Sequence, residues 1–340
     1  MRLFAEILTV HTKHPFIIAR GGTSEFRVVW VRLQDADGLE GWGEAAPSAF
    51  YGETADSVMT ALARFTPIVE AADGWSIDAI ERAIEKSLRW NAAARTAISA
   101  ALHDLAAKRI GIPLYKMFGL SGMVTPTSSF TIGIAPDDET LRARVRDAAD
   151  YPILKIKLGT ARDEEIVRIV REEAPNATLR VDANAAWSPK RALAMLDTLT
   201  TYGVDMLEQP VAPHDIAGMR FVRERSPIAV VADESCIVAS DIPKLEGAVD
   251  GINIKLAKCG SLREAHRMIA VARAHGMRVM CGCMIETTLG IAAAAHLSHL
   301  LDDADLDGAT LLADDPFIGP TIPNGRVTLS EAPGLGVRRR

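Results

Sequence analysis

The spacing of hydrophobic and polar residues divides the chain into two parts. Residues 26–44 read as two strands joined by a turn at residues 35–38. Residues 54–110 have helical spacing, and the alanine-rich stretch 92–110 ends at a Gly-Ile-Pro stop signal. Strands followed by helices predict an α+β unit over residues 1–120.

After Ser121 and Gly122 the pattern changes to short apolar runs that alternate with helical stretches. The interval between successive runs is about that of one strand-plus-helix unit, which favours parallel strands. We expect strands at residues 127–132, 153–157, 178–181, 206–208, 228–232, 251–254 and 278–281.

A closed parallel barrel explains this series better than an open sheet, because no dinucleotide-binding fingerprint accompanies it. The glycine pairs at residues 21–22 and 41–43 do not lie between a strand and a helix as a phosphate loop does, so we interpret them as turns.

Composition narrows the functional classes. The chain is 48% hydrophobic and carries a formal net charge of -6, which gives no reason to expect a nucleic-acid partner. No apolar stretch reaches the roughly 18 residues of a membrane span, and the N-terminus lacks the pattern of a signal peptide. Four cysteines make no disulfide framework. We therefore expect a cytoplasmic protein without a membrane partner.

The candidate chemistry lies where the predicted strands end. Active sites of parallel barrels are built at the carboxyl ends of the strands, so residues at these positions converge on one rim. The residues in question are Lys155 and Lys157, then Asp182 and Asn184, Glu208, Asp233, Asn253 and Lys255, and Glu286.

Three of these residues are acids that follow consecutive strands: Asp182, Glu208 and Asp233. Each alone could be a turn or helix-capping residue. Together on one rim they would repel one another, and a hard divalent cation with oxygen ligands relieves that repulsion. The sequence therefore predicts an Mg²⁺ site.

Lysines end the strands on either side of those that carry the three acids, which suggests proton transfer beside that cation. We expect Lys155 and Mg²⁺ to lower the pKa of Lys157, which must be neutral to act as a base. Lys157 and Lys255 on opposite sides of the cation could remove a proton from one face of a carbon next to a carboxylate and return it on the other. The cation would stabilise the enediolate, so racemisation or epimerisation follows.

These residues also resemble a known family. The motifs Lys155-Ile156-Lys157, Asp182-Ala183-Asn184, Glu208-Gln209-Pro210, Asp233-Glu234-Ser235 and Asn253-Ile254-Lys255 are similar to those of the muconate-lactonising subgroup of the enolase superfamily. The resemblance implies an α/β fold, a modified TIM barrel of the (β/α)₇β type. It also implies one Mg²⁺ per subunit and a homo-oligomer.

The same resemblance implies the domain organisation. An α+β capping domain would span residues 1–120, and the barrel with the catalytic residues would span residues 121–315. Residues 316–340 would form a C-terminal segment that packs back on the capping domain.

Within that subgroup the chain resembles L-Ala-D/L-Glu dipeptide epimerases, which take a peptide of the cell wall. The matching stretches are residues 14–21, 43–53 and 305–307. The resemblance implies that Arg20 binds the side-chain carboxylate of the substrate and that Asp305 and Asp307 bind its ammonium group. Asn184, Asn253 and Glu286 are further candidate substrate contacts.

Other functions stay open at this point. A muconate cycloisomerase, an o-succinylbenzoate synthase or an N-acylamino acid racemase would share the fold, but their substrates carry no ammonium group for Asp305 and Asp307. A non-catalytic metal-binding barrel would have no need of the flanking lysines. Residues 46–51 depart from the capping loop of Ala-Glu epimerases, so the preferred dipeptide is open as well.

Overall fold

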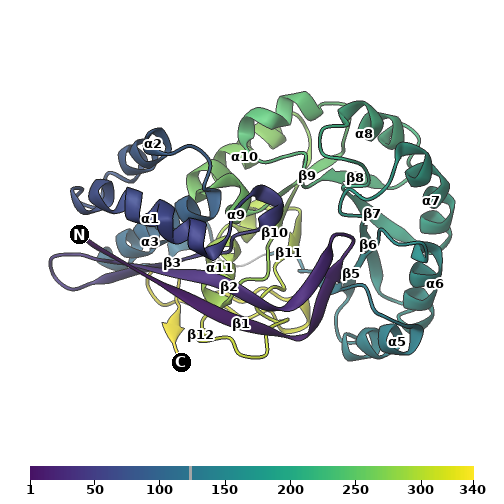
Figure 1. The fold of residues 1–340 in the computed structure, drawn as a ribbon, viewed down its shortest axis with the longest axis horizontal. Coiled ribbons are helices and arrows are strands. Elements are labelled where there is room, and N and C mark those ends of the chain that lie inside the picture. Colours follow the sequence, from purple (N-terminus) through teal and green to yellow (C-terminus); the bar gives the residue numbers. More distant parts are fainter. Residues whose placement is uncertain (122–124) are drawn as a thin grey trace.

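The computed structural model describes residues 1–121 and 125–340 and has two parts (Figure 1). Gly122, where we expect the first part to give way to the second, lies outside the described residues. An antiparallel sheet with helices makes up the first part, and a parallel barrel makes up the second. None of the described helices is long and apolar enough to cross a membrane.

The N-terminal sheet has the order β1-β2-β3. Its strands are β1 (Arg2–Ile18), β2 (Gly21–Gln34) and β3 (Glu40–Ala45). Helices α1 (Ala55–Glu70), α2 (Ile77–Ser87) and α3 (Ala92–Arg109) cover one face, where buried side chains of β2 such as Val29 and Val31 join those of the helices in one core. The short helix α4 (Leu114–Met117) follows.

The prediction that Gly41 and Gly43 mark turns is wrong, because both lie within β3. They allow the strand to lie directly against α3. A Cβ atom at Gly43 would lie 2.1 Å from the carbonyl oxygen of Ala97, and one at Gly41 would lie 2.1 Å from that of Ala101. Small residues on both elements therefore explain this close packing.

The barrel contains eight parallel strands that pair in chain order. They are β4 (Phe130–Ile132), β5 (Ile153–Lys157), β6 (Thr178–Asp182), β7 (Val204–Glu208), β8 (Ala229–Ala232), β9 (Gly251–Ile254), β10 (Arg278–Gly282) and β11 (Asp303–Asp305). A parallel bridge between Ser128, two residues before β4, and Ala304 of β11 closes the sheet. The predicted fold class is confirmed, with strand boundaries shifted by a few residues.

Helices connect these strands on the outside of the barrel (Figure 1). They are α5 (Asp138–Asp147), α6 (Asp163–Glu173), α7 (Pro189–Thr201), α8 (Ile216–Arg223), α9 (Leu256–Cys259), α10 (Leu262–Ala274) and α11 (Thr288–Ala295). Between β8 and β9 the chain forms the 3₁₀ helix η2 (Ala239–Leu245), in which Pro243 is incompatible with a regular α-helix interior.

The C-terminal segment returns to the N-terminal part. Phe317, in β12 (Phe317–Ile318), packs edge-on against Trp30 of β2 with ring centroids 5.4 Å apart. The backbone N–H of Leu335 donates to the buried Asp104 of α3 at 2.7 Å. Strand β13 (Arg338–Arg339) pairs with β12. The domain boundaries at residues 120 and 315 stay a prediction.

Acid is expected to destabilise the fold through His296, a buried residue that directly follows α11. Its Nδ1 accepts the N–H of Tyr115 at 3.1 Å while Nε2 faces the carbonyl oxygen of Leu335 at 3.2 Å, an arrangement that suits the neutral ring. Burial lowers the pKa of His296 to about 4. The unfolded chain therefore takes up this proton at higher pH than the folded chain, and stability falls as the pH falls from about 6.5 toward 4.

The measurement is urea unfolding of the wild type and of His296→Gln at pH 7.5 and pH 5. We expect the wild type to lose about 2 kcal/mol more than the variant over this interval. The exposed His14→Gln serves as control and should lose as much as the wild type. Equal losses in wild type and His296→Gln would contradict the assignment.

Candidate active site

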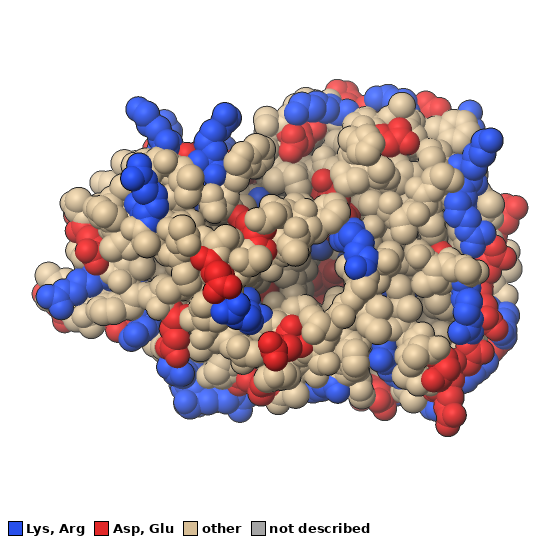
Figure 2. Space-filling model, in the orientation of Figure 1, with Lys and Arg blue, Asp and Glu red and all other residues tan. Residues whose placement is uncertain are grey.

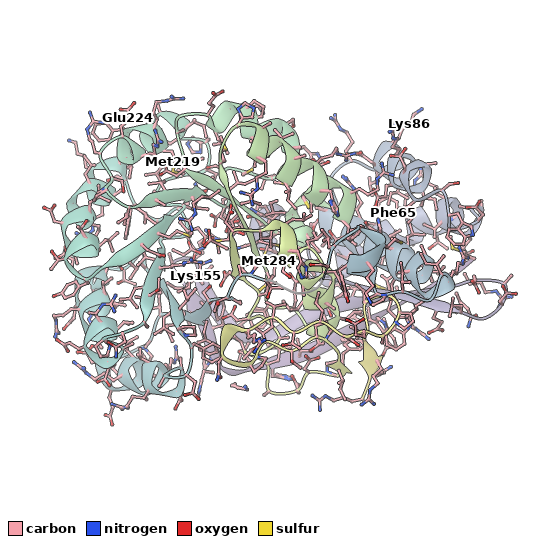
Figure 3. All side chains as sticks on the ribbon, turned by 180° about the vertical axis from the view of Figure 1, so that it is seen from behind. Phe65, Lys86, Lys155, Met219, Glu224 and Met284 are labelled. Carbon is pink, nitrogen blue, oxygen red and sulfur yellow. The ribbon has the colours of Figure 1, made fainter. Side chains whose placement is uncertain are left out.

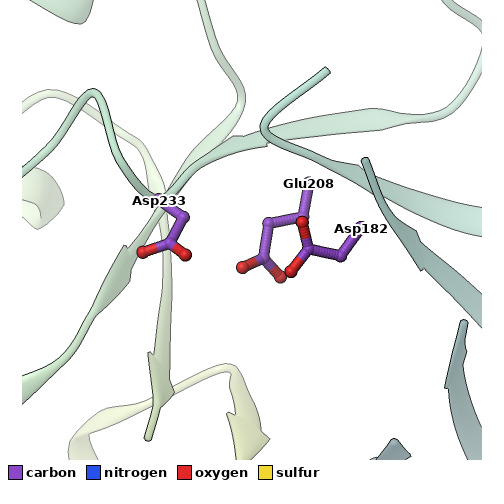
Figure 4. A group of neighbouring side chains, drawn as sticks. All are labelled: Asp182, Glu208 and Asp233. Atoms are coloured by element: carbon purple, nitrogen blue, oxygen red, sulfur yellow. The ribbon is translucent and has the colours of Figure 1, made fainter. Parts of the chain in front are cut away.

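Three carboxylates meet at the carboxyl ends of three adjacent strands (Figure 4). Asp182 ends β6, Glu208 ends β7, and Asp233 directly follows β8. All three are buried, and one oxygen from each lies within 4.8 Å of the others. The structure thus brings the three predicted metal ligands together.

The backbone bends sharply after the first two of these residues. Asn184, Ala185 and Gln209 have φ angles of 44°, 64° and 36°, a region that residues other than glycine rarely adopt. Side chains hold the bends in place. The Oε1 atom of the buried Gln209 accepts the N–H groups of Asp233 at 3.0 Å and of Ser235 at 3.1 Å. Gln209, which directly follows Glu208, therefore connects that ligand to the backbone of Asp233. The sequence did not predict this role.

Lysine side chains approach the carboxylates from both sides. Lys157 of β5 contacts Asp182, with Nζ 2.7 Å from Oδ2. Lys255, directly after β9, contacts Asp233, with Nζ 2.8 Å from Oδ2. Strands β6, β7 and β8 lie between β5 and β9, so the two lysines flank the carboxylates as predicted.

Lys155 has a different surrounding from the other two lysines. It lies among the barrel strands (Figure 3), and its Nζ is 2.7 Å from Glu208, 2.7 Å from Asp305 and 3.3 Å from Asp182. Burial alone would lower the pKa of Lys155, but these carboxylates outweigh it and raise the pKa well above its usual value. Lys155 is therefore a permanent cation that joins the carboxylate triad to Asp305.

The three carboxylates differ in the direction in which their surroundings shift the pKa. Burial and the charge of Asp182 raise the pKa of Glu208 to about 7. Burial also acts to raise the pKa values of Asp182 and Asp233, but the neighbouring lysines more than offset it and lower both. The triad thus gathers three buried carboxylates, whose oxygens are ligands that a divalent cation prefers.

Buried acceptors around the triad fit a hydrated divalent cation. Oδ1 of Asn184, Oδ1 of Asn253 and Oε2 of Glu234 have no hydrogen-bond partner among the described residues. Mg²⁺ is bound by carboxylate oxygens and usually keeps several water molecules, which are donors. Asp182, Glu208 and Asp233 are suited to hold Mg²⁺ directly, and these three acceptors are suited to its water ligands.

The amide groups of Asn184 and Asn253 donate to the carboxylates, and the substrate contacts that we expect of these two residues stay a prediction. Asn253 Nδ2 lies 2.9 Å from Glu208 Oε1, and Asn184 Nδ2 lies 3.2 Å from Asp182 Oδ2.

Glu286 is buried next to Glu44 and accepts the N–H of Met284 at 2.9 Å. Burial raises the pKa of Glu286 to about 7, while Lys255 opposes this rise.

Asp305 and Asp307 lie at the same rim, at the end of the last strand. Asp305 accepts from Lys155 and from the hydroxyl of Ser129, both at 2.7 Å. Asp307 accepts the backbone N–H of Thr131 at 2.6 Å, and burial together with Asp305 raises its pKa to about 7. Asp305 therefore contacts the lysine that also contacts two metal ligands, and Asp307 lies close to Asp305.

Arg20 reaches the site from the other part of the molecule. The hairpin of β1 and β2 extends over the barrel, and the space-filling view shows a hollow with acidic side chains inside it (Figures 1 and 2). At its tip, Arg20 donates to the carbonyl oxygen of Asn184 at 2.7 Å and to Glu234 at 2.8 Å. Its guanidinium lies 4.1 Å from the centre of the Phe50 ring. The hairpin tip is thus held against the barrel rim.

Sequence patterns did not predict the role of Lys258. It is fully buried in α9, three residues after Lys255, and contacts Asp233 at 2.5 Å. No local pattern pointed to it, because Lys255 is extended and only Lys258 lies in the helical turn.

Two known protein families match this chain, one in each part of the structure. Residues 139–340 match the family described as enolase C-terminal domain-like. Residues 4–119 match the N-terminal domain of mandelate racemase and muconate lactonizing enzyme.

Individual relatives are similar over almost the full chain. The L-Ala-D/L-Glu epimerase of Bacteroides thetaiotaomicron is 38% identical over 96% of this chain and 85% of its own length. The hydrophobic dipeptide epimerase of Flavobacteria bacterium MS024-2A is 37% identical over 97% of this chain and 95% of its own. A crystal structure of the dipeptide epimerase from Enterococcus faecalis V583, complexed with Mg and L-Leu-L-Tyr, superposes with a TM-score of 0.93 at 32% identity and covers 99% of both chains.

Proposed function

Because this chain belongs to the enolase superfamily, in the mandelate racemase and muconate lactonizing enzyme family, we propose that it is an Mg²⁺-dependent dipeptide epimerase. The observation that carries the proposal is the arrangement of two lysines on opposite sides of the buried carboxylate triad. Such an arrangement suits a reaction in which a carbon atom loses a proton on one face and gains one on the other.

The lysines carry out the proton transfers. The neutral amine of one lysine removes the α-proton of the C-terminal residue of the dipeptide, and the ammonium of the other donates a proton to the opposite face. Asp182, Glu208 and Asp233 would hold Mg²⁺, which would supply positive charge beside the substrate carboxylate as negative charge develops there. Lys155 stays protonated and adds positive charge beside Lys157.

The free ammonium group of the substrate binds to Asp305 and Asp307 in this proposal. Both carboxylates are buried at or just after the end of the last strand, and that of Asp305 contacts Lys155. A buried carboxylate is a strong partner for a charged donor. Substrates of cycloisomerases and N-acylamino acid racemases carry no such group, so these two residues favour a dipeptide.

L-Ala-L/D-Glu is the first substrate to test, because Arg20 lies at the mouth of the site and a guanidinium binds a carboxylate in two places. Arg20 would exchange its contact with Glu234 for the side chain of the substrate. The relatives include a hydrophobic dipeptide epimerase, so the choice of dipeptide must be measured.

The test is incubation of the Mg²⁺-loaded protein with a dipeptide library in D₂O, followed by mass spectrometry and chiral analysis. We expect one deuteron in L-Ala-L-Glu together with formation of L-Ala-D-Glu. Exchange into a different dipeptide would keep the reaction and change the assignment of Arg20. No exchange into any dipeptide would overturn the proposal, and a cycloisomerase substrate would be tested next.

Asp305→Asn is expected to weaken binding of the dipeptide. A hydrogen bond to a charged group contributes about 1.5–3 kcal/mol, which corresponds to a rise in KM of about ten- to hundred-fold. The wild type should strongly prefer a dipeptide over its N-acetylated form, and the variant should lose most of this preference. An unchanged KM and an unchanged preference would rule out Asp305 as the ammonium site.

A further inference from the structure

Lys258 is a buried cation that the proposed proton transfers do not use. It belongs to α9, the single turn that follows β9, and its side chain is 0% exposed. Transfer of a lysine ammonium from water into a protein interior costs several kcal/mol. An apolar side chain of similar shape at such a position often gives a fold that is equally stable or more stable. Stability alone therefore does not explain a lysine at this position.

Four oxygen atoms surround the ammonium group of Lys258. Nζ lies 2.5 Å from Oδ1 and 2.6 Å from the carbonyl oxygen of Asp233. It also lies 3.0 Å from the carbonyl oxygen of Asn253 and 3.1 Å from that of Cys236. Lys258 thus links the end of β9 to the loop after β8, and its contact of opposite charge is the carboxylate of a metal ligand.

The two oxygens of Asp233 have different partners. Oδ1 is bonded to Lys258, whereas Oδ2 is 2.8 Å from the catalytic-site lysine Lys255. A carboxylate with one oxygen fixed can no longer rotate freely about its Cβ–Cγ bond. Oδ2 is therefore the atom left to face the centre of the triad.

In the other two predicted metal ligands as well, the two carboxylate oxygens have different partners. Oδ1 of Asp182 accepts the backbone N–H of Asn184 at 2.8 Å, and Oε1 of Glu208 accepts the amide of Asn253 at 2.9 Å. The second oxygen of each contacts a lysine at the rim. In each of the three ligands one oxygen is held by a fixed donor, and only Asp233 uses a charged side chain for this.

We propose that Lys258 is a positioning residue of the metal site, which holds Oδ1 of Asp233 and thereby presents Oδ2 to the divalent cation and to Lys255. This role of Lys258 rests on the metal site of the proposed function and does not depend on the identity of the substrate.

The test is the affinity of the full chain for Mn²⁺, measured by the electron paramagnetic resonance signal of the free ion. Lys258→Met keeps the length of the side chain and removes its charge and donors. If Lys258 acted only as a positive charge, its removal would reduce repulsion and tighten Mn²⁺ binding. If it positions Asp233, Mn²⁺ binding weakens, and we expect a loss of at least about tenfold, or 1.4 kcal/mol.

Two further variants make the outcome decisive. Lys244→Met removes a lysine that is 69% exposed and pairs with Asp241, and it should bind Mn²⁺ like the wild type. Lys258→Gln retains N–H donors without the charge. It should lose less affinity than Lys258→Met, and it replaces that variant if the latter does not fold by circular dichroism. Unchanged or tighter Mn²⁺ binding in the Lys258 variants would overturn the proposal.

The Mn²⁺ measurement needs no substrate, so its failure is distinguishable from failure of the proposed epimerase activity. Once the wild type has shown exchange in D₂O, a second measurement follows. Asp233 contacts Lys255 and not Lys157, so Lys258→Met should slow deuterium uptake from the epimer that Lys255 deprotonates more than from the other. The comparison is made at an Mg²⁺ concentration that saturates the variant, since loss of the cation would slow both epimers. Equal slowing under that condition would contradict an effect of Asp233 on Lys255.

Discussion

Lys157→Ala and Lys255→Ala are each expected to abolish epimerisation. The two variants should differ in which epimer still exchanges its α-proton with solvent. A positioned general base or acid contributes about 10²–10⁴-fold to a rate, and epimerisation needs both lysines. Exchange of one epimer with solvent needs only the lysine on its own face. Each variant should therefore still exchange the α-proton of one epimer while losing that of the other.

The expectation follows from the separate contacts of the two side chains. Lys157 comes from β5 and contacts Asp182, whereas Lys255 follows β9 and contacts Asp233, so removal of one leaves the surroundings of the other in place. The measurement is proton NMR of L-Ala-L-Glu and L-Ala-D-Glu in D₂O with each variant.

Lys244→Ala, at an exposed position of the 3₁₀ helix η2, is the control and should retain full activity in both directions. Loss of exchange from both epimers in both variants would argue against one lysine for each face. Full epimerase activity in either variant would refute the two-base scheme.

Much of the site could be predicted from the sequence because a parallel barrel brings strand ends together. The apolar runs at residues 153–157, 178–182 and 204–208 end in charged residues, and a local pattern is enough to detect each of them. Once the strands are parallel and adjacent, convergence of Lys157, Asp182, Glu208, Asp233 and Lys255 follows from topology.

The last strand could not be found in this way. Strand β11 has the sequence Asp-Ala-Asp, and both acids are buried. Asp303 forms ion pairs with Arg180 and Arg278, and Asp305 forms one with Lys155, all from other strands of the barrel. A polar strand of this kind has no hydrophobic signature. Only the resemblance to known epimerases pointed to Asp305 and Asp307.

Side-chain pairing was also outside the reach of local patterns. The contact of Lys155 with Asp305 joins residues 150 positions apart, and the contact of Arg20 with Glu234 joins residues 214 positions apart. Such contacts depend on how the hairpin crosses the rim and on which rotamers the packing allows. The sequence indicated that these residues belong to the site but did not indicate their partners.

Glu208→Gln is expected to remove most of the affinity for Mg²⁺ and to reduce turnover by about 10³-fold, since a bound metal ion contributes several kcal/mol of transition-state stabilisation. Glu208 is the central member of the triad, between Asp182 and Asp233, and the change replaces an anionic ligand by a neutral amide of the same shape. Its Oε2 also lies 2.7 Å from Lys155, whose positive charge would then face the cation with less compensation.

A thermal measurement separates this effect from a general loss of structure. A ligand that binds only the folded state at a concentration of 100 times its Kd stabilises the fold by about 2.7 kcal/mol, so Mg²⁺ should raise the Tm of the wild type. The Tm of Glu208→Gln should not respond to Mg²⁺. Asp205→Asn is the matched control, because Asp205 lies on the same strand near its opposite end and is 41% exposed. This control should keep the response to Mg²⁺, and a response retained by Glu208→Gln would show that the cation binds elsewhere.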